Sequence, residues 1–319
     1  MSGRNHIYIT SHHEDENCFW LAVKHFLAWL GHDRLPGFVT AAISVAESAG
    51  RVSVHEQPSP AFVDERDVFT VVSANLWHDW PRYKNLDKRL EAFASLVESE
   101  HADLILLQEL VRKPSLKADE WLAERLNMAH VYSRVNGSEK IGFEEGLGVF
   151  SRFPLKQIPY LRQLGRTCNP FVRRLALGVE VDTPFGAMMA FSTHLGLFRK
   201  QNARQLGELH EWIDKITSGR SAIIAGDFNS PEHTRQIKYI RDYWQDTFRE
   251  IHEHGHASTH EIRWPWGGAI LSRRLDYIFL QPGEPAWRVV DVQHVDAADG
   301  PHSDHRAVLA RFMPGQAVM

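Results

Sequence analysis

Residues 225–230 read Ala225-Gly226-Asp227-Phe228-Asn229-Ser230, and this stretch decides the fold of the chain. An apolar run from Ser221 to Ile224 precedes it and predicts a buried strand, whereas Pro231 follows it and cannot continue one. The glycine before Asp227 suits a sharp exit into a loop. Because side chains two residues apart on a strand point to the same side, the Asp and the Asn reach one place.

The same arrangement recurs along the chain, with polar side chains where other apolar strands begin or end. Loops held at the ends of strands are where catalytic residues usually lie. We therefore expect these side chains to form one site at the edge of a sheet core. The polar residues at these positions are Asn75, Gln108, Glu109, His194, Asp276, Asp304 and His305.

The composition, with 43% hydrophobic and 24% charged residues, is that of a soluble globular protein. A formal net charge of −4 argues against a strongly basic protein that wraps nucleic acid. It does not exclude a nuclease, because an enzyme needs only a local positive patch at its cleft. Arg174 is our candidate for such a patch and for substrate binding, with Arg199 and Arg204 as further candidates. Each is equally compatible with solvated surface charge.

Cys18 and Cys168 are the only cysteines, so we expect neither a disulfide framework nor a cysteine zinc site. We see no secretory signal, and the longest apolar stretch, Cys18 to Leu30, is too short to span a bilayer. We therefore predict a cytoplasmic protein.

Residues 1–62 differ from the rest and predict a helical N-terminal extension followed by a linker. Its two expected helices, 19–30 and 38–49, are separated by a turn with several breakers. They either pack on the main domain, mediate dimerisation or touch a membrane surface, and the scarcity of basic flanks disfavours the membrane. The cluster His12 to Glu16 is either a metal site or, in our preferred interpretation, a solvated tail.

Residues 63–319 alternate between strands and helices and predict one catalytic domain. The mixture of hairpins with βα units indicates an α/β fold of two packed β-sheets flanked by helices. We expect strands at 68–73, 104–108, 130–134, 147–151, 176–181 and 187–193, and helices at 86–98, 118–126 and 199–216.

The chemistry of these residues indicates a hard metal ion. Glu109, Asn75 and Asp304 offer oxygen ligands of the kind that Mg²⁺ or Mn²⁺ prefers. His194 and His305 can take, give or share a proton near neutral pH. Since Asp304 and His305 diverge if that segment is extended, Asp276 is the better orienting partner for His305.

Together these motifs resemble the endonuclease/exonuclease/phosphatase superfamily, whose members include DNase I-like nucleases, neutral sphingomyelinases, inositol-polyphosphate 5-phosphatases and deadenylases. The resemblance covers roughly residues 68 to 312 and is carried by six motifs in the order typical of the superfamily. They are Asn75-Leu-Trp, Leu107-Gln-Glu109, Ser192-Thr-His194-Leu, Gly226-Asp-Phe-Asn229, Leu275-Asp276-Tyr and Ser303-Asp-His305.

The resemblance implies a four-layer α/β sandwich of two mixed β-sheets, and divalent-metal-dependent hydrolysis of a phosphate ester. Glu109 and Asn75 would hold the metal with help from Asp304. Among the catalytic residues, Asp227 would orient or activate the water, and Asn229 would contact the phosphate or a second metal. His194 would stabilise the transition state. His305, oriented by Asp276, would be the general base or its electrostatic equivalent.

Substrate choice in such a fold depends on loops outside the shared residues. We expect two, Asn136 to Glu145 and His254 to Arg273, the second with Trp264 and Trp266. These tryptophans either bind substrate, by stacking on a base or holding a headgroup cation, or pack the loop on the domain. We predict a nuclease acting on a phosphodiester in nucleic acid. The alternatives are a phosphatase or phospholipase C-type esterase on an inositol or lipid phosphate, and an inactive binding scaffold.

Overall fold

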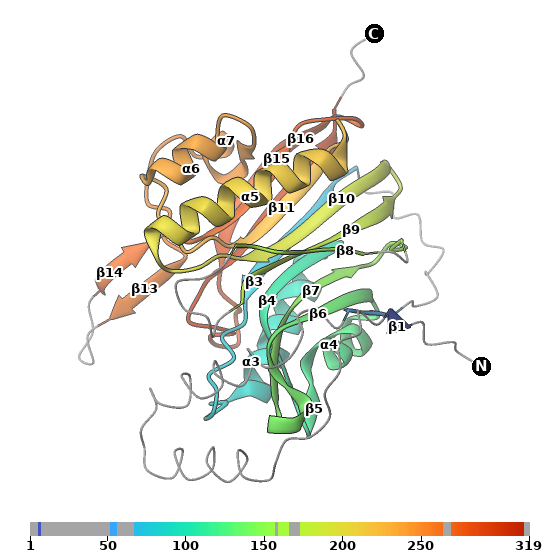
Figure 1. The fold of residues 1–319 in the computed structure, drawn as a ribbon, viewed down its shortest axis with the longest axis vertical. Helices are drawn as coiled ribbons and strands as arrows, with labels where there is room; N and C mark the ends of the chain where they lie inside the picture. The colour runs from blue at the N-terminus through green and yellow to red at the C-terminus, as the bar shows by residue number, and fades with distance from the viewer. Residues whose placement is uncertain are drawn as a thin grey trace.

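Two stacked β-sheets form the centre of the computed structural model (Figure 1). The structure describes residues 6–7, 52–55, 67–156, 159–165, 173–263 and 269–315. The two helices predicted for the N-terminal extension, the His12 to Glu16 cluster, and both Trp264 and Trp266 lie outside the described residues.

The first sheet has nine strands in the order β1-β2-β6-β7-β4-β3-β17-β16, with β5 paired to β4. The neighbours β3 and β4 are parallel, and the other pairs in this sheet are antiparallel. The strands are β1 (His6–Ile7), β2 (Val52–His55), β3 (Phe69–Asn75), β4 (Leu104–Lys113), β5 (Leu116–Lys117), β6 (Ala129–Ser138), β7 (Phe143–Ser151), β16 (Trp287–Val295) and β17 (Ala307–Pro314).

The second sheet has six strands in the order β12-β15-β11-β10-β9-β8, with β10 and β11 parallel. A separate hairpin, β13 (His260–Arg263) and β14 (Ala269–Arg273), projects from the side of the molecule (Figure 1). The strands of the second sheet are β8 (Tyr160–Gln163), β9 (Leu175–Thr183), β10 (Gly186–His194), β11 (Ala222–Asp227), β12 (Gln245–Asp246) and β15 (Asp276–Gln281).

Helices cover the outer face of each sheet and complete four layers. Helices α3 (Leu86–Ser99) and α4 (Ala118–Leu126) share an apolar core with the first sheet, and α5 (Arg199–Thr217) and α6 (Arg235–Ile240) share one with the second. A third core lies between the sheets and includes Phe248 of the short α7 (Thr247–Ile251). The predicted four-layer sandwich is therefore confirmed.

Local patterns located the main elements well. Helix α4 has the predicted bounds, and α3 and α5 each run one residue further than predicted. Three segments differ from prediction. Strand β4 continues past Glu109 to Lys113. Strand β2 lies within the predicted linker but pairs with β6. Most of the predicted loop 136–145 belongs to β6, β7 and the 3-10 turn Glu139–Ile141.

No helix among these described segments is long and apolar enough to cross a membrane.

Candidate active site

The strand ends predicted to carry chemistry meet at one end of the two sheets. In the second sheet, His194 at the end of β10 pairs with Asp227 at the end of β11, and Asp227 pairs with Asp276 at the start of β15. In the first sheet, Asn75 at the end of β3 pairs with Gln108 of β4. The register therefore brings together residues that lie far apart in sequence.

Gly226 lets β11 approach β10 closely just before Asp227. Its φ is +150°, and a Cβ at this position would lie 1.9 Å from the carbonyl oxygen of Thr193. Any other residue would clash with backbone that has no room to move, because Thr193 is its partner in the sheet. The glycine thus fixes where the Asp227 carboxylate enters the site.

Glu109 is turned into the site by an irregularity in its strand. The pairing of β4 with β7 shifts register between Leu107 and Leu110, and Glu109 has a φ of +55°. A non-glycine residue in this conformation is strained and typical of functional sites. Its carboxylate accepts hydrogen bonds from the Asn75 side chain (Nδ2 to Oε1, 3.1 Å) and from the His78 backbone N–H (3.1 Å to Oε2).

Asn75 joins the carboxylates of the two sheets. Its Oδ1 accepts the Trp77 N–H at 2.9 Å, so its amide group is oriented with Nδ2 toward Glu109 and Asp227. The distance from Nδ2 to Asp227 Oδ2 is 3.2 Å. The Asn75 NH₂ group therefore faces the acids, and Oδ1 is the only atom of this side chain that could bind a metal.

Asp227 and Asp276 form a buried acidic pair. Burial, and then the charge of Asp276, raise the pKa of Asp227 to about 7. The backbone N–H of Asn229 donates to Asp227 Oδ1 at 2.8 Å. The Asn229 side chain itself donates to the Leu195 carbonyl at 2.9 Å and so ties the two strand-end loops together.

His305 is paired with Asp276, as the sequence predicted. The distance from His305 Nδ1 to Asp276 Oδ2 is 2.7 Å, and the Thr259 hydroxyl donates to the same oxygen at 2.6 Å. Burial lowers the pKa of His305, but the Asp276 carboxylate outweighs it and raises the pKa to about 10. This imidazole therefore carries a positive charge at neutral pH.

His194 has the opposite character. Its Nε2 lies 3.5 Å from Asp227 Oδ2. Burial, and then the nearby Arg174 guanidinium, hold its pKa well below the ordinary value, so the ring is neutral. Arg174 is only 9% exposed, and within the described residues its Nε has no hydrogen-bond partner. A buried cation with an unused donor is suited to binding an anion.

Two residues that the sequence analysis missed extend the site. His78 Nδ1 lies 3.0 Å from the Trp80 backbone nitrogen, and His78 Nε2 lies 3.1 Å from Glu145 Oε2. Asn136 also donates to Glu145. His78 could have been noticed because it follows the Asn75 motif by three residues. Glu145 gave no such signal, since it lay in a predicted loop.

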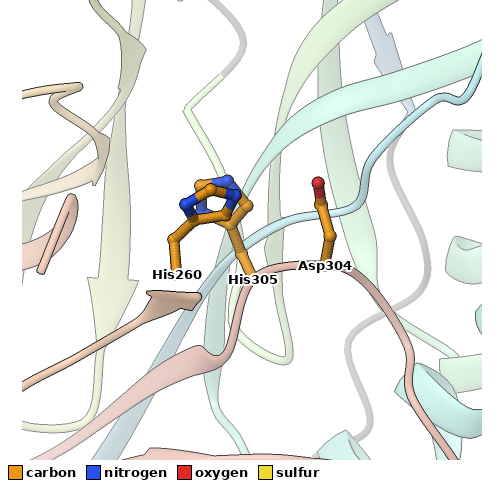
Figure 2. A group of neighbouring side chains, drawn as sticks. All are labelled: His260, Asp304 and His305. Atoms are coloured by element: carbon orange, nitrogen blue, oxygen red, sulfur yellow. The ribbon is translucent and has the colours of Figure 1, made fainter. Parts of the chain in front are cut away.

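Asp304 lies beside His305 (Figure 2). Its side chain accepts from the Ser303 hydroxyl at 3.2 Å. Asp304 is exposed, yet partial loss of water around its carboxylate raises its pKa, His305 opposes the rise, and the charge of Glu109 adds to it. The electrostatic coupling to Glu109 is compatible with the predicted ligand role, and the neighbouring ring of His260 was not anticipated.

The residues present fit a hard divalent cation. Three groups of possible ligands lie at this end of the sheets, namely Asp227, Asp276 and His305; His78, Glu109 and Glu145; and His260, Asp304 and His305. The Oδ1 of Asp276 is buried without a hydrogen-bond partner in the described chain. Carboxylate oxygens are the ligands that Mg²⁺ and Mn²⁺ prefer. Loss of water around Asp227 and Asp304, to which neighbouring carboxylates add, raises the pKa values of both groups, and a bound cation would favour their charged forms.

This four-layer sandwich gathers acids and imidazoles at one end of its two sheets. Residues 72–305 match the family model described as the Endonuclease/Exonuclease/phosphatase family. The chain therefore belongs to this family, whose members are generally phosphoester hydrolases and typically depend on a divalent metal. A sequence search among curated proteins found no match.

Solved structures from the same family share the fold. An endonuclease/exonuclease/phosphatase from Beutenbergia cavernae is 22% identical with a TM-score of 0.65, over 79% of this chain and 73% of that one. The human Nocturnin catalytic domain with bound sulfate is 17% identical with a TM-score of 0.62, covering 79% and 97%. A humanised D. rerio TDP2 is 18% identical with a TM-score of 0.59, covering 77% and 99%.

Proposed function

We propose that this protein is a metal-dependent phosphodiesterase that hydrolyses nucleic acid. The observation that carries the proposal is the placement of two imidazoles against two buried acids. His194 Nε2 lies 3.5 Å from Asp227 Oδ2, and His305 Nδ1 lies 2.7 Å from Asp276 Oδ2. His194 is neutral and His305 is held as a cation by Asp276. Such a pair can donate to a phosphate and transfer a proton at neutral pH.

Mg²⁺ or Mn²⁺ would be held by Glu109, Asn75 and Asp304. When bound, it supplies positive charge against which negative charge on the phosphate oxygens is stabilised. Glu109 is the principal ligand in this assignment, because its carboxylate is held in place by Asn75 and the His78 backbone.

Asp227 is our candidate for the residue that orients and deprotonates the attacking water. A pKa near 7 suits a general base at neutral pH. The water oxygen forms a bond to phosphorus, its proton passes to Asp227, and the phosphorus bond to the leaving oxygen breaks. The leaving oxygen takes a proton from His305 or from water. His194 and Asn229 donate to the non-bridging oxygens, with Arg174 as a fixed cation nearby.

One observation favours the runner-up, an esterase acting on a lipid or inositol phosphate. Leu197 and Phe198, which closely follow His194, are 71% and 60% exposed. Large apolar side chains beside a polar site are compatible with a substrate that has an apolar part. Trp264 and Trp266 remain predicted substrate-binding residues.

The test is hydrolysis by the purified protein with Mg²⁺, Mn²⁺ or EDTA. The substrates are single- and double-stranded DNA, RNA, sphingomyelin, inositol phosphates and bis-p-nitrophenyl phosphate, with Glu109→Ala as the control. Metal-dependent cleavage of a nucleic acid that the variant loses would support the proposal. Cleavage of only a lipid or inositol phosphate would favour the runner-up, and no cleavage of any substrate would favour a binding scaffold.

A further inference from the structure

His260 stands against His305 although the predicted mechanism has no use for it. The two residues form an isolated antiparallel bridge, and their ring centroids are 4.5 Å apart at an interplanar angle of 38°. Figure 2 shows the two rings overlapping with Asp304 beside them. One donor atom from each of the three side chains lies within 4.8 Å of the others.

His305 is arranged as metal-binding histidines usually are. Its Nδ1 is bound to Asp276, whose same oxygen accepts from Thr259, so Nε2 is left for another partner. A carboxylate on the second nitrogen is the common outer support of a histidine ligand, because it fixes the ring and increases its basicity. His260 is half-buried, and its ring packs against that of His305.

This group shares Asp304 with the proposed Mg²⁺ site, but its two imidazoles make it a different donor set. Zn²⁺ takes histidine nitrogens together with a carboxylate, whereas Mg²⁺ prefers oxygen donors. We propose that His260, His305 and Asp304 form a second cation site, for Zn²⁺ or a similar transition metal, whose occupation inhibits the enzyme.

Inhibition follows because the ion would bind the His305 nitrogen that faces away from Asp276. That nitrogen is the one available for the leaving group or the phosphate, and a coordinated nitrogen cannot carry a proton to either. This consequence rests on the proposed function, whereas binding of the ion does not. His260 itself belongs only to the inhibitory site.

The first measurement is Zn²⁺ binding to the full chain in the presence of excess Mg²⁺, by competition with a chromophoric chelator. We expect His260→Asn to weaken Zn²⁺ binding by about tenfold or more, since loss of an outer-shell partner alone has that effect. His254→Asn, in an exposed histidine, is the matched control and should bind as the wild type does. Thermal melting of both variants verifies that they are folded.

The second measurement is Zn²⁺ inhibition of whichever hydrolysis the protein performs. His260→Asn should retain Mg²⁺-dependent turnover and require about tenfold more Zn²⁺ for half inhibition. The proposal is overturned if folded His260→Asn binds Zn²⁺ as tightly as the wild type, or if His254→Asn loses as much Zn²⁺ affinity as His260→Asn does. It is also overturned if Glu109→Gln abolishes Zn²⁺ binding and His260→Asn does not. Zn²⁺ binding that depends on His260 in a protein without phosphoesterase activity would refute the proposed function and leave the site standing.

Discussion

At the scale of single residues, the site is built on strained backbone. Glu109 and Asn229 have positive φ values of 55° and 49°, and each is held there by hydrogen bonds to a neighbouring strand end. Such conformations cost of order 1–3 kcal/mol each and persist only where the surroundings determine them. Asn75 Nδ2 donates to one carboxylate from each sheet, Glu109 and Asp227, and Asp227 also accepts the Asn229 backbone N–H.

Gly226→Ala is expected to lower the free energy of unfolding by about 2 kcal/mol or more, because the new Cβ would meet the Thr193 carbonyl oxygen 1.9 Å away. Gly207→Ala is the matched control. It lies within α5 with no atom within 4 Å of the added Cβ, and it should stabilise the protein by about 0.5–1 kcal/mol. Urea unfolding of both variants measures the two changes, and equal effects would contradict the role given to Gly226.

Asp276→Asn is expected to lower turnover by about two orders of magnitude while changing KM little, because it removes the charge that holds His305 protonated and oriented. His305→Ala should have an effect of similar size, and the double variant should be little worse than either alone. Steady-state kinetics on the substrate found in the panel checks this. Falls of less than tenfold in both single variants would remove these residues from the mechanism.

At the scale of elements, the sequence predicted what depends on local pattern. An apolar run with a polar end is visible in a single segment, so the ends of β3, β10 and β11 were located and their residues proved to converge. The register in which strands pair cannot be read from a single segment. Glu145 pairs with both Val111 and Asn136 because the register shifts in two strand pairs, β4 with β7 and β6 with β7. The sequence does not show these shifts, so Glu145 was predicted to lie in a loop.

Helix α4 is attached to the first sheet by a buried charge. Asp119 pairs with Arg112 of β4 (Nε to Oδ1, 2.7 Å) and with His130 of β6 (3.3 Å). Burial alone would raise the pKa of Asp119, but these two partners outweigh it and hold the pKa well below its ordinary value. The carboxylate therefore contributes stability above its unfolded pKa of about 3.9, and this contribution is lost as the pH falls below that value.

Asp119→Asn should consequently lower the free energy of unfolding by about 3 kcal/mol at pH 7, because it leaves the Arg112 charge buried without its partner. The deficit should persist at pH 5 and shrink at pH 3, where the wild type begins to lose the same interaction. Urea unfolding at the three pH values measures it. A deficit that stayed constant down to pH 3 would mean that packing, and not charge, is responsible.

At the scale of the whole molecule, the site is where the two sheets are joined by polar contacts. Gln108 of the first sheet donates to the Ser192 hydroxyl of the second at 3.1 Å, and Ser192 donates to the Leu107 carbonyl at 3.0 Å. Above them Asn75 links Glu109 to Asp227. The sequence identified most members of this site, but it could not show which member faces which, because that depends on how the sheets stack.

A cation bound between these carboxylates should therefore stabilise the entire sandwich. Binding to the folded state alone adds about 2.7 kcal/mol when the free ion is at a hundred times its Kd, so the melting temperature should rise with Mg²⁺ and fall in EDTA. Glu109→Gln should remove most of the rise in melting temperature with Mg²⁺. In EDTA this variant should melt no lower than the wild type, because the substitution removes repulsion between carboxylates. Glu124→Gln, an exposed acid on α4, is the control and should keep the full response. Calorimetry across a Mg²⁺ series decides the matter. If Glu109→Gln and the wild type responded alike, the ion would be held elsewhere, and Glu109 would lose its assignment as the principal ligand.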